Sequence, residues 1–395
     1  MMLNQQQQGL LLLIRSAMLQ KPEKLPEKFS LARAVNLIER QQITSIALEG
    51  ALLCGISPEL PEMQMLIEKS CALYSLSSCQ MDEVKRLCVD FDDNQIDYLL
   101  LKGTNLKELY PEPHMREMSD ADILIRIAQY EKIKPILCSR GFVAGQESDH
   151  ELHWDKPTLH LELHKRLIPS NNKQFSKYFQ NIWNRAICIS DAKSQYILTK
   201  EDELIFYIVH FAKHYRDGGI GSKHLIDLWL FMKNNAGMDT DYISAELTKL
   251  SLSDFFSNLC ATMQVWFGDR AHDEKTELIT EVILGGGAYG RCDMQYIASA
   301  ARYSNAAGST KRGRLKRIKY LFFPTFDTMC RMYPVLKKTP VLLPFVWIYR
   351  WIHALIFKGK TVKTRYAEAK TVTPQVIEEY QKKLSSVGLN FDENE

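Results

Sequence analysis

The feature of this chain that most constrains its fold is a change in the spacing of its apolar residues near position 96. Before that point, residues 5–92 repeat apolar side chains three and four positions apart, which is typical of amphipathic helices. From about 96 to 167 the apolar runs are short and end at Gly, Pro or Asp, which indicates strands. The helical spacing returns after about 172. The sequence therefore predicts an α+β protein with a small mixed β-sheet flanked by helical regions.

Three regions follow from this change of spacing. We expect an N-terminal helical region at 1–92, a mixed core at 93–170 and a C-terminal helical region at 171–395. The last region contains a basic segment, 302–370, with sixteen Lys and Arg residues against two acidic residues. The chain as a whole carries a net charge of only +3, because acidic residues elsewhere balance this segment. So small a net charge does not favour a nucleic acid as partner.

Cysteine usage and the apolar runs bear on the compartment. The nine cysteines follow no regular spacing and include no C-x-x-C pair, which is typical of reduced thiols. The N-terminal segment has neither the basic region nor the small-residue cleavage site of a signal peptide. The longest apolar stretch, 341–357, contains Pro344, Arg350 and His353 and is shorter than the roughly 20 residues that a membrane span needs. We therefore expect a cytoplasmic protein.

Two aspartates at the start of one expected strand are the first candidates for chemistry. Asp120 and Asp122 open the run 119–125, and the two-residue period of a strand places both carboxylates on one face. Adjacent carboxylates repel each other unless a cation lies between them. The pair therefore predicts a site for a hard divalent metal, Mg²⁺ or Mn²⁺, which would bridge nucleotide phosphates.

A glycine-containing turn upstream of the acid pair has the layout of a phosphate-binding loop. Lys102 and Gly103 close an apolar strand, and Thr104 opens a short helix expected to extend to about 110. Glycine lets a phosphate approach the backbone, and the helix N-terminus supplies N–H groups. Lys102 and Arg116 add positive charge, and arginine can bind a phosphate through two hydrogen bonds.

A third acid lies on a later strand. Between 158 and 165, leucines alternate with His160, Glu162 and His164, so these polar side chains share one face. Glu162 is the carboxylate of that face. It could ligate a second metal ion or accept the proton of an attacking hydroxyl group.

In this order, these residues resemble the uncharacterised nucleotidyltransferase family of the DNA polymerase β-like nucleotidyltransferase superfamily. The resemblance is carried by Leu101-Lys102-Gly103-Thr104, Tyr110-Pro111, Arg116, Ser119-Asp120-Ala121-Asp122-Ile123-Leu124-Ile125 and Leu161-Glu162-Leu163-His164. Thr104 stands where serine is usual in the family, and Ala121 stands where a bulkier apolar residue is usual. Neither difference alters a metal ligand.

The resemblance implies a metal-dependent enzyme. It implies Asp120, Asp122 and Glu162 as catalytic residues and metal ligands, and nucleotide binding by Lys102, Gly103, Thr104, Arg116 and Ser119. It also implies Mg²⁺ or Mn²⁺ as cofactor, a nucleoside triphosphate such as ATP as donor, and transfer of a nucleotidyl group to an acceptor hydroxyl. The acceptor, whether small molecule, glycan or protein, is not implied. The alternative is a catalytically inactive nucleotide-binding or scaffold protein on the same fold, with or without peripheral attachment to a membrane.

A pair of histidines on an expected helix is a further candidate feature. His210 and His214 lie four positions apart and so share one helix face. Packing against the sheet, or a position beside the triphosphate, explains them better than zinc binding, because no matching set of further ligands is evident. Asp227 on the next helix could pair with one of them.

The basic run at 311–319 precedes an apolar stripe that extends to 358. This combination is typical of a helix packed on the protein body with a solvated basic edge. It is also typical of an interfacial helix on an anionic membrane surface, so residues 311–358 are a candidate membrane contact. We prefer lipid to nucleic acid as the partner of this segment, because its large apolar residues form a stripe and do not interleave with basic residues for base stacking.

Overall fold

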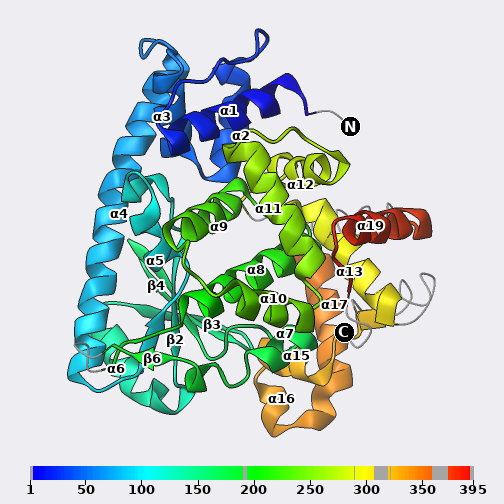
Figure 1. Ribbon diagram of the computed structural model, residues 1–395. Coiled ribbons are helices and arrows are strands. Elements are labelled where there is room, and N and C mark those ends of the chain that lie inside the picture. The colour runs from blue at the N-terminus through cyan, green and yellow to red at the C-terminus, as the bar shows by residue number, and fades with distance from the viewer. Residues whose placement is uncertain are drawn as a thin grey trace. The chain divides into compact units, whose positions relative to one another are not determined.

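The computed structural model describes residues 3–189, 194–288, 290–306, 319–320, 322–357 and 372–391 of the chain. Figure 1 labels the helices and strands of the chain, which divides into two compact units. The first unit comprises Met1–Tyr215 and Ile220–Gly290, and the second comprises Arg216–Gly219 and Arg291–Glu395. The expected sheet and all the candidate site residues belong to the first unit.

A five-stranded mixed sheet lies in the first unit. Its strands are β1 (Tyr98–Leu100), β2 (Asp120–Ile125), β3 (Val143–Glu147), β4 (Glu151–Lys156) and β5 (Leu159–His164). Their order is β1-β2-β5-β4-β3, in which β2 and β5 are parallel and the other neighbours are antiparallel. A two-stranded sheet pairs β6 (Ile187–Cys188) with β7 (Tyr196–Ile197). The predicted α+β class with a small mixed sheet is confirmed.

Helices precede the sheet, as the spacing of apolar residues predicts. They are α1 (Gln5–Leu19), α2 (Leu31–Gln41), α3 (Thr44–Leu53) and α4 (Pro61–Asp93). The helical spacing of apolar residues over 63–73 and over 76–90 belongs to one 33-residue helix. No Gly or Pro occurs after Pro61 to interrupt it, and Pro61 itself occupies the first turn, where proline is tolerated.

The apolar face of the sheet packs against α4 and α6 (Tyr130–Ser139). This core contains helix and strand residues that are almost fully buried, including Leu87, Phe91, Ile123, Ile133, Leu137, Leu161 and Leu163. The leucines of β5 therefore point into the core, while the half-buried His160 and Glu162 point away from it, as the alternation predicts. His164 lies on the same polar face but is more deeply buried than His160 and Glu162. It is only 2% exposed, because it lies against the buried carboxylate of Asp122.

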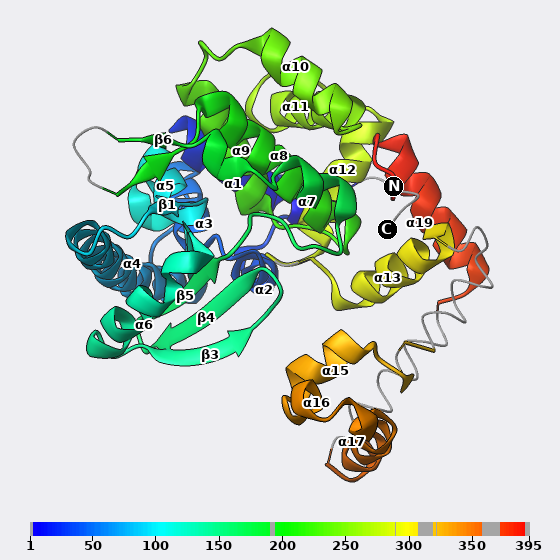
Figure 2. The ribbon, with the colours of Figure 1, turned by 90° about the horizontal axis from the view of Figure 1, so that it is seen from below.

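The polar face of the sheet is covered by α8 (Lys200–Arg216) and α9 (Ser222–Asn234), as seen from below in Figure 2. Further helices of this unit are α5 (Gly103–Leu106), α7 (Lys173–Tyr178), α10 (Thr240–Lys249), α11 (Ser253–Phe267) and α12 (Glu274–Gly285). The helix expected from Thr104 to about 110 is the short helix α5, which ends at Leu106 and continues as a 3₁₀ turn at Lys107–Leu109. A cavity lies between the helices α8 and α9 and the sheet, and it is lined by residues of both helices and of the strands β2, β4 and β5.

The described part of the second unit is helical. It contains α13 (Cys292–Ala306), α15 (Phe326–Met332), α16 (Val335–Lys338), α17 (Leu343–Phe357) and α19 (Pro374–Ser386). Met329, Cys330 and Leu336 form a small apolar cluster against which Trp347 packs. Much of the basic segment, including 311–318 and 358–370, lies outside the described residues. Within the part of the chain that the structure describes, no helix has the length and apolarity needed to cross a membrane.

Candidate active site

The two aspartates and the third acid meet because β2 and β5 are parallel neighbours. In this pairing Asp120 lies opposite His160, and Asp122 lies opposite Glu162. Residues opposite each other on adjacent strands point to the same face of a sheet. Asp120, Asp122 and Glu162 consequently line one cavity, with a volume of about 330 Å³.

Asp122 is held by two neighbouring side chains. Its Oδ1 accepts a hydrogen bond from Nζ of Lys102 at 3.3 Å and lies 2.7 Å from Nε2 of His164. Burial acts to raise the pKa of Asp122, but Lys102 and the His164 hydrogen bond more than offset it and lower that pKa below its usual range. The pKa of Asp120 is raised instead, because burial and repulsion from Asp122 outweigh the attraction of Lys102. Asp122 is therefore the firmly ionised member of the pair.

Glu151 on β4 adds a further carboxylate to the cavity. Its Oε1 lies 2.7 Å from Nε2 of His150. Burial acts to raise the pKa of Glu151, but the His150 hydrogen bond and nearby positive charge lower it to about 2. Burial, together with the negative charges of Glu151, Asp122 and Asp120, raises the pKa of Glu162 to about 8. Glu162 therefore experiences negative charge that its protein neighbours do not neutralise.

The acidic wall of the cavity has the donor chemistry of a site for a hard divalent cation. Ligand atoms of Asp122, Glu162 and His164 lie within 4.8 Å of one another. Carboxylate oxygens are the ligands that Mg²⁺ and Mn²⁺ prefer in proteins. A cation placed among these groups would also offset the repulsion that raises the pKa of Glu162. The residues present thus fit the metal that the sequence predicts.

A second wall of the cavity, formed by α8 and α9, is basic. His210, Lys213 and His214 come from α8, while Lys223 and His224 come from α9. The ring centroid of His210 lies 4.4 Å from the ring centroid of His214 and 5.7 Å from that of His224. Burial, aided by neighbouring positive charge, lowers the pKa of His214 to about 3 and holds the pKa values of His210 and His224 well below their usual range. The imidazoles are therefore neutral near pH 7, and the lysines supply the positive charge.

The loop between β1 and α5 joins a strand to a helix at Lys102 and Gly103, as the sequence predicts. Lys102, not Gly103, adopts a positive φ, of 40°. Glycine at 103 leaves room for Arg116, because a Cβ atom there would lie 2.8 Å from Nη1 of that side chain, which the ion pair with Asp227 holds in place. The hydroxyl group of Thr104 donates to the carbonyl oxygen of Leu101 at 2.9 Å, so it closes the turn and does not line the cavity. Because α5 is four residues long, it supplies little of the helix dipole expected at this loop.

Arg116 is anchored by a buried ion pair. Its Nε and Nη2 each lie 2.8 Å from a carboxylate oxygen of Asp227, which belongs to α9. The hydroxyl group of Tyr110 donates to the same carboxylate at 2.7 Å. Asp227 therefore pairs with Arg116 and Tyr110, and not with the histidines that the sequence suggested. Arg116 and the exposed Ser119 both line the cavity, but Asp227 already occupies one edge of the guanidinium group.

Sequence reasoning missed several cavity residues, among them Glu151, Lys223 and His224. A signal was available for Glu151, because polar residues at 151, 153 and 155 alternate with Leu152 and Trp154. No comparable local signal exists for Lys223 and His224. They reach the cavity only because α9 packs over the sheet.

The mixed sheet, the paired acids on β2 and the third acid on the parallel strand β5 are the features of a nucleotidyltransferase core. A family model described as an uncharacterised nucleotidyltransferase matches residues 27–268, which is more than half of the chain. The chain therefore belongs to this family, and the resemblance stated from its motifs is confirmed. Among curated proteins and among solved structures, no match to the chain was found.

Proposed function

We propose that this protein is a metal-dependent nucleotidyltransferase that moves a nucleotidyl group from a nucleoside triphosphate, ATP in the first instance, to an acceptor hydroxyl. The observation that supports this most directly is the register of β2 and β5. It sets Asp122 opposite Glu162, with Asp120 two residues away, in a cavity that also contains Lys102 and Gly103.

Asp120, Asp122 and Glu162 would hold the metal, Mg²⁺ or Mn²⁺. Such an ion would orient the triphosphate and neutralise the charge that develops on the leaving pyrophosphate as the acceptor oxygen bonds to the α-phosphate and the bond between the α- and β-phosphates breaks. His164 contributes by fixing the orientation of Asp122 through the 2.7 Å contact between Nε2 and Oδ1. A bound cation would lower the raised pKa of Glu162 and ionise its carboxylate, which could then serve as a metal ligand or accept the proton of the acceptor hydroxyl.

The basic wall suits the triphosphate. Lys213 and Lys223 line the cavity on α8 and α9, and Lys102 lies beside the carboxylates. A lysine ammonium group attracts phosphate oxygens, and a cavity of low dielectric strengthens that attraction. The neutral rings of His210, His214 and His224 can each donate one hydrogen bond and accept another, so they add polar contacts without further charge.

Calorimetric titration of ATP into the full chain, with Mg²⁺ in excess, tests the proposal. We expect Asp122→Asn to weaken binding at least about tenfold, or ~1.4 kcal/mol, because the metal bridging protein and triphosphate loses a charged ligand. Asp82→Asn, a change of the same chemistry at an exposed position on α4, serves as the matched control and should bind like the wild type. Equal affinity in Asp122→Asn and the wild type would remove the metal role from Asp122. Failure of every nucleoside triphosphate to bind would undercut the function as a whole.

The acceptor is proposed only by class: a hydroxyl group of a small molecule, glycan or protein. Incubating candidate acceptors with labelled triphosphate, followed by mass spectrometry, decides between an enzyme and a nucleotide-binding scaffold. Transfer that is lost in Asp122→Asn supports catalysis. Tight nucleotide binding without transfer to any acceptor favours the scaffold.

We propose in addition that α17 contacts an anionic membrane surface. Phe345, Ile348, Ile352 and Ile356 recur at helical spacing, and each is at least 49% exposed. Earlier in the same sequence region, residues 311–319 are strongly basic. Exposed apolar side chains on a helix, in a segment rich in basic residues, are typical of a helix that lies in the headgroup region of a membrane.

A further inference from the structure

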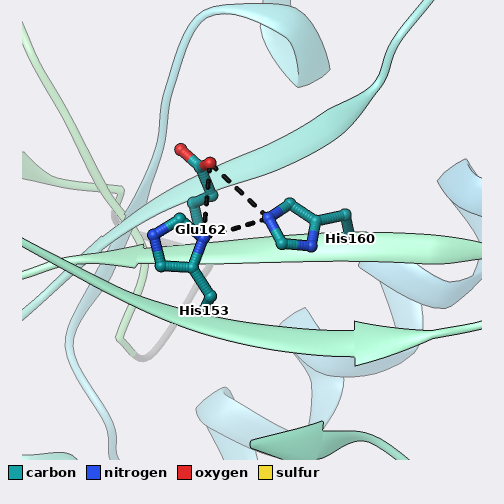
Figure 3. A group of neighbouring side chains, drawn as sticks. All are labelled: His153, His160 and Glu162. Carbon is teal, nitrogen blue, oxygen red and sulfur yellow. Dashed lines mark hydrogen bonds and ion pairs between the residues drawn. The ribbon is translucent and has the colours of Figure 1, made fainter. Parts of the chain in front are cut away.

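A second group of potential metal ligands lies on the polar face of the sheet. His153 on β4 is directly opposite Glu162 on β5, and His160 lies two residues before Glu162 on the same strand. Figure 3 shows the side chains of these residues converging on one point. Their side chains are between 17% and 33% exposed, so the group is accessible but partly shielded from water.

The distances within this group match those around a bound transition metal. Nδ1 of His153 lies 3.1 Å from Nε2 of His160, and each of these nitrogens lies 3.6 Å from Oε1 of Glu162. A point equidistant from the three atoms is about 2 Å from each of them, which is the length of a zinc–nitrogen or zinc–oxygen bond. Two imidazoles and one carboxylate also form the ligand set that zinc-class ions favour over Mg²⁺.

The outer nitrogens of both rings face carboxylates. Nδ1 of His160 lies 2.5 Å from Oδ1 of Asp155, and Nε2 of His153 lies 3.6 Å from Oε2 of Glu151. A carboxylate that accepts the outer N–H of a histidine sets its tautomer, which leaves the other nitrogen free to coordinate a metal. Metal-binding histidines almost always have such a partner, so the hydrogen bond between His160 and Asp155 supports the same assignment as the triangle itself; the 3.6 Å contact of His153 with Glu151 is an ion-pair contact and not a hydrogen bond.

We propose that His153, His160 and Glu162 bind a divalent transition metal of the zinc class, at a site separate from the Asp120–Asp122 pair. The proposal does not depend on nucleotidyl transfer, because it concerns metal binding in the absence of nucleotide. Glu162 links the two sites: Oε1 faces the histidine pair, while Oε2 lies 3.9 Å from Nε2 of His164. An ion on the histidine pair would therefore hold the carboxylate that the Asp122 site shares.

Titration of the full, metal-stripped chain with Co²⁺ tests the site, since Co²⁺ replaces zinc and gives an intense visible absorption band when it is bound in a tetrahedral site. Excess Mg²⁺ is present so that the oxygen ligands of the hard-metal site are filled. We expect one equivalent to bind, and Zn²⁺ to displace it. His160→Gln should weaken binding at least about 100-fold, because it removes a direct ligand. Asp155→Asn should weaken it ~10-fold, the usual loss when an outer-shell carboxylate is removed.

Two control variants locate the ion. His114→Gln removes a histidine outside the cavity, and Asp120→Asn removes a carboxylate of the neighbouring site; both should bind Co²⁺ within about threefold of the wild type. Circular dichroism and thermal melts establish that each variant is folded, and Asp155 is 59% exposed, so its substitution leaves the core intact. Absence of the band in wild type, or equal binding by wild type and His160→Gln, overturns the site. Loss of the band in Asp120→Asn also overturns it, because the ion would then occupy the acid pair.

Discussion

Substitution of Asp227 by Asn tests whether the buried ion pair with Arg116 is an anchor of the site. The side chains of Arg116 and Asp227 are only 6% and 7% exposed, and both contacts from Asp227 to the guanidinium group are 2.8 Å long. Asparagine keeps the shape of the side chain, but its NH₂ group would face an N–H of Arg116 or the hydroxyl of Tyr110, which are donors. The guanidinium group would then be buried without a negative partner.

The expected loss of stability follows from this burial. Removing one partner of a buried ion pair costs about 3–5 kcal/mol, because the remaining charge stays out of water without compensation. Glu131→Gln is the matched control: Nζ of Lys134 lies 2.6 Å from Glu131, but these side chains are 40% and 81% exposed. An exposed pair contributes ~0–1 kcal/mol despite its equally short distance. The two variants therefore separate the effect of burial from that of distance.

Urea unfolding of the full chain, followed by circular dichroism, measures the difference. Asp227→Asn should lower the free energy of unfolding by about 3–5 kcal/mol and Glu131→Gln by less than ~1 kcal/mol. The double variant Arg116→Met/Asp227→Val should recover part of the loss, because neither apolar side chain needs a charge partner, although the Tyr110 hydroxyl loses its acceptor. The reasoning is refuted if Asp227→Asn is as stable as Glu131→Gln, or if the double variant is no more stable than Asp227→Asn.

Further measurements address the loop, the histidines and the exposed helix. Gly103→Ala should cost ~1–3 kcal/mol of stability and weaken ATP binding, because its Cβ would lie 2.8 Å from the anchored Arg116; unchanged melting and binding would contradict this close approach. Since the pKa of His214 is lowered to about 3 from 6.5, the unfolded chain binds more protons between these values, so the stability that neutral His214 contributes is present above pH 6.5 and is lost as the pH falls toward 3. His214→Asn should reduce the proton uptake on unfolding at pH ~5 by about one proton, and an unchanged uptake would show that the ring titrates normally. In co-sedimentation with vesicles containing phosphatidylserine at low salt, Phe345→Ser/Ile352→Ser should bind at least about tenfold more weakly than wild type; no binding by the wild type would exclude the membrane contact.

The alternation of apolar and polar residues was enough to predict which way the side chains of a strand point. The alternation along 158–165 predicted which residues of β5 enter the core, and the structure buries Leu159, Leu161 and Leu163 accordingly. The two-residue period likewise placed Asp120 and Asp122 on one face before any pairing was known. Such predictions succeed because the direction of a strand side chain depends only on its position within the strand.

Contacts between distant segments account for what the sequence could not predict. The pattern at 97–104 indicated a strand, a glycine-containing turn and a helix, but it could not show that Lys102 adopts a positive φ or that the side chain of Arg116 lies against Gly103. The partner of Arg116 is Asp227, more than a hundred residues further along the chain. No local pattern in the sequence predicts the pairing of Arg116 with Asp227, because the pairing arises from the packing of α9 over the sheet.

By itself, the sequence determined the class of the fold, the family and the acidic residues on the polar faces of two strands. Whether those acids meet was decided only by the tertiary structure, through the parallel pairing of β2 with β5. The same pairing, together with β4, brings His153 and His160 to Glu162 and so creates the second candidate metal site. The physical reason is that a periodic pattern specifies which way a side chain points, whereas the register of separate strands depends on the packing of the whole unit.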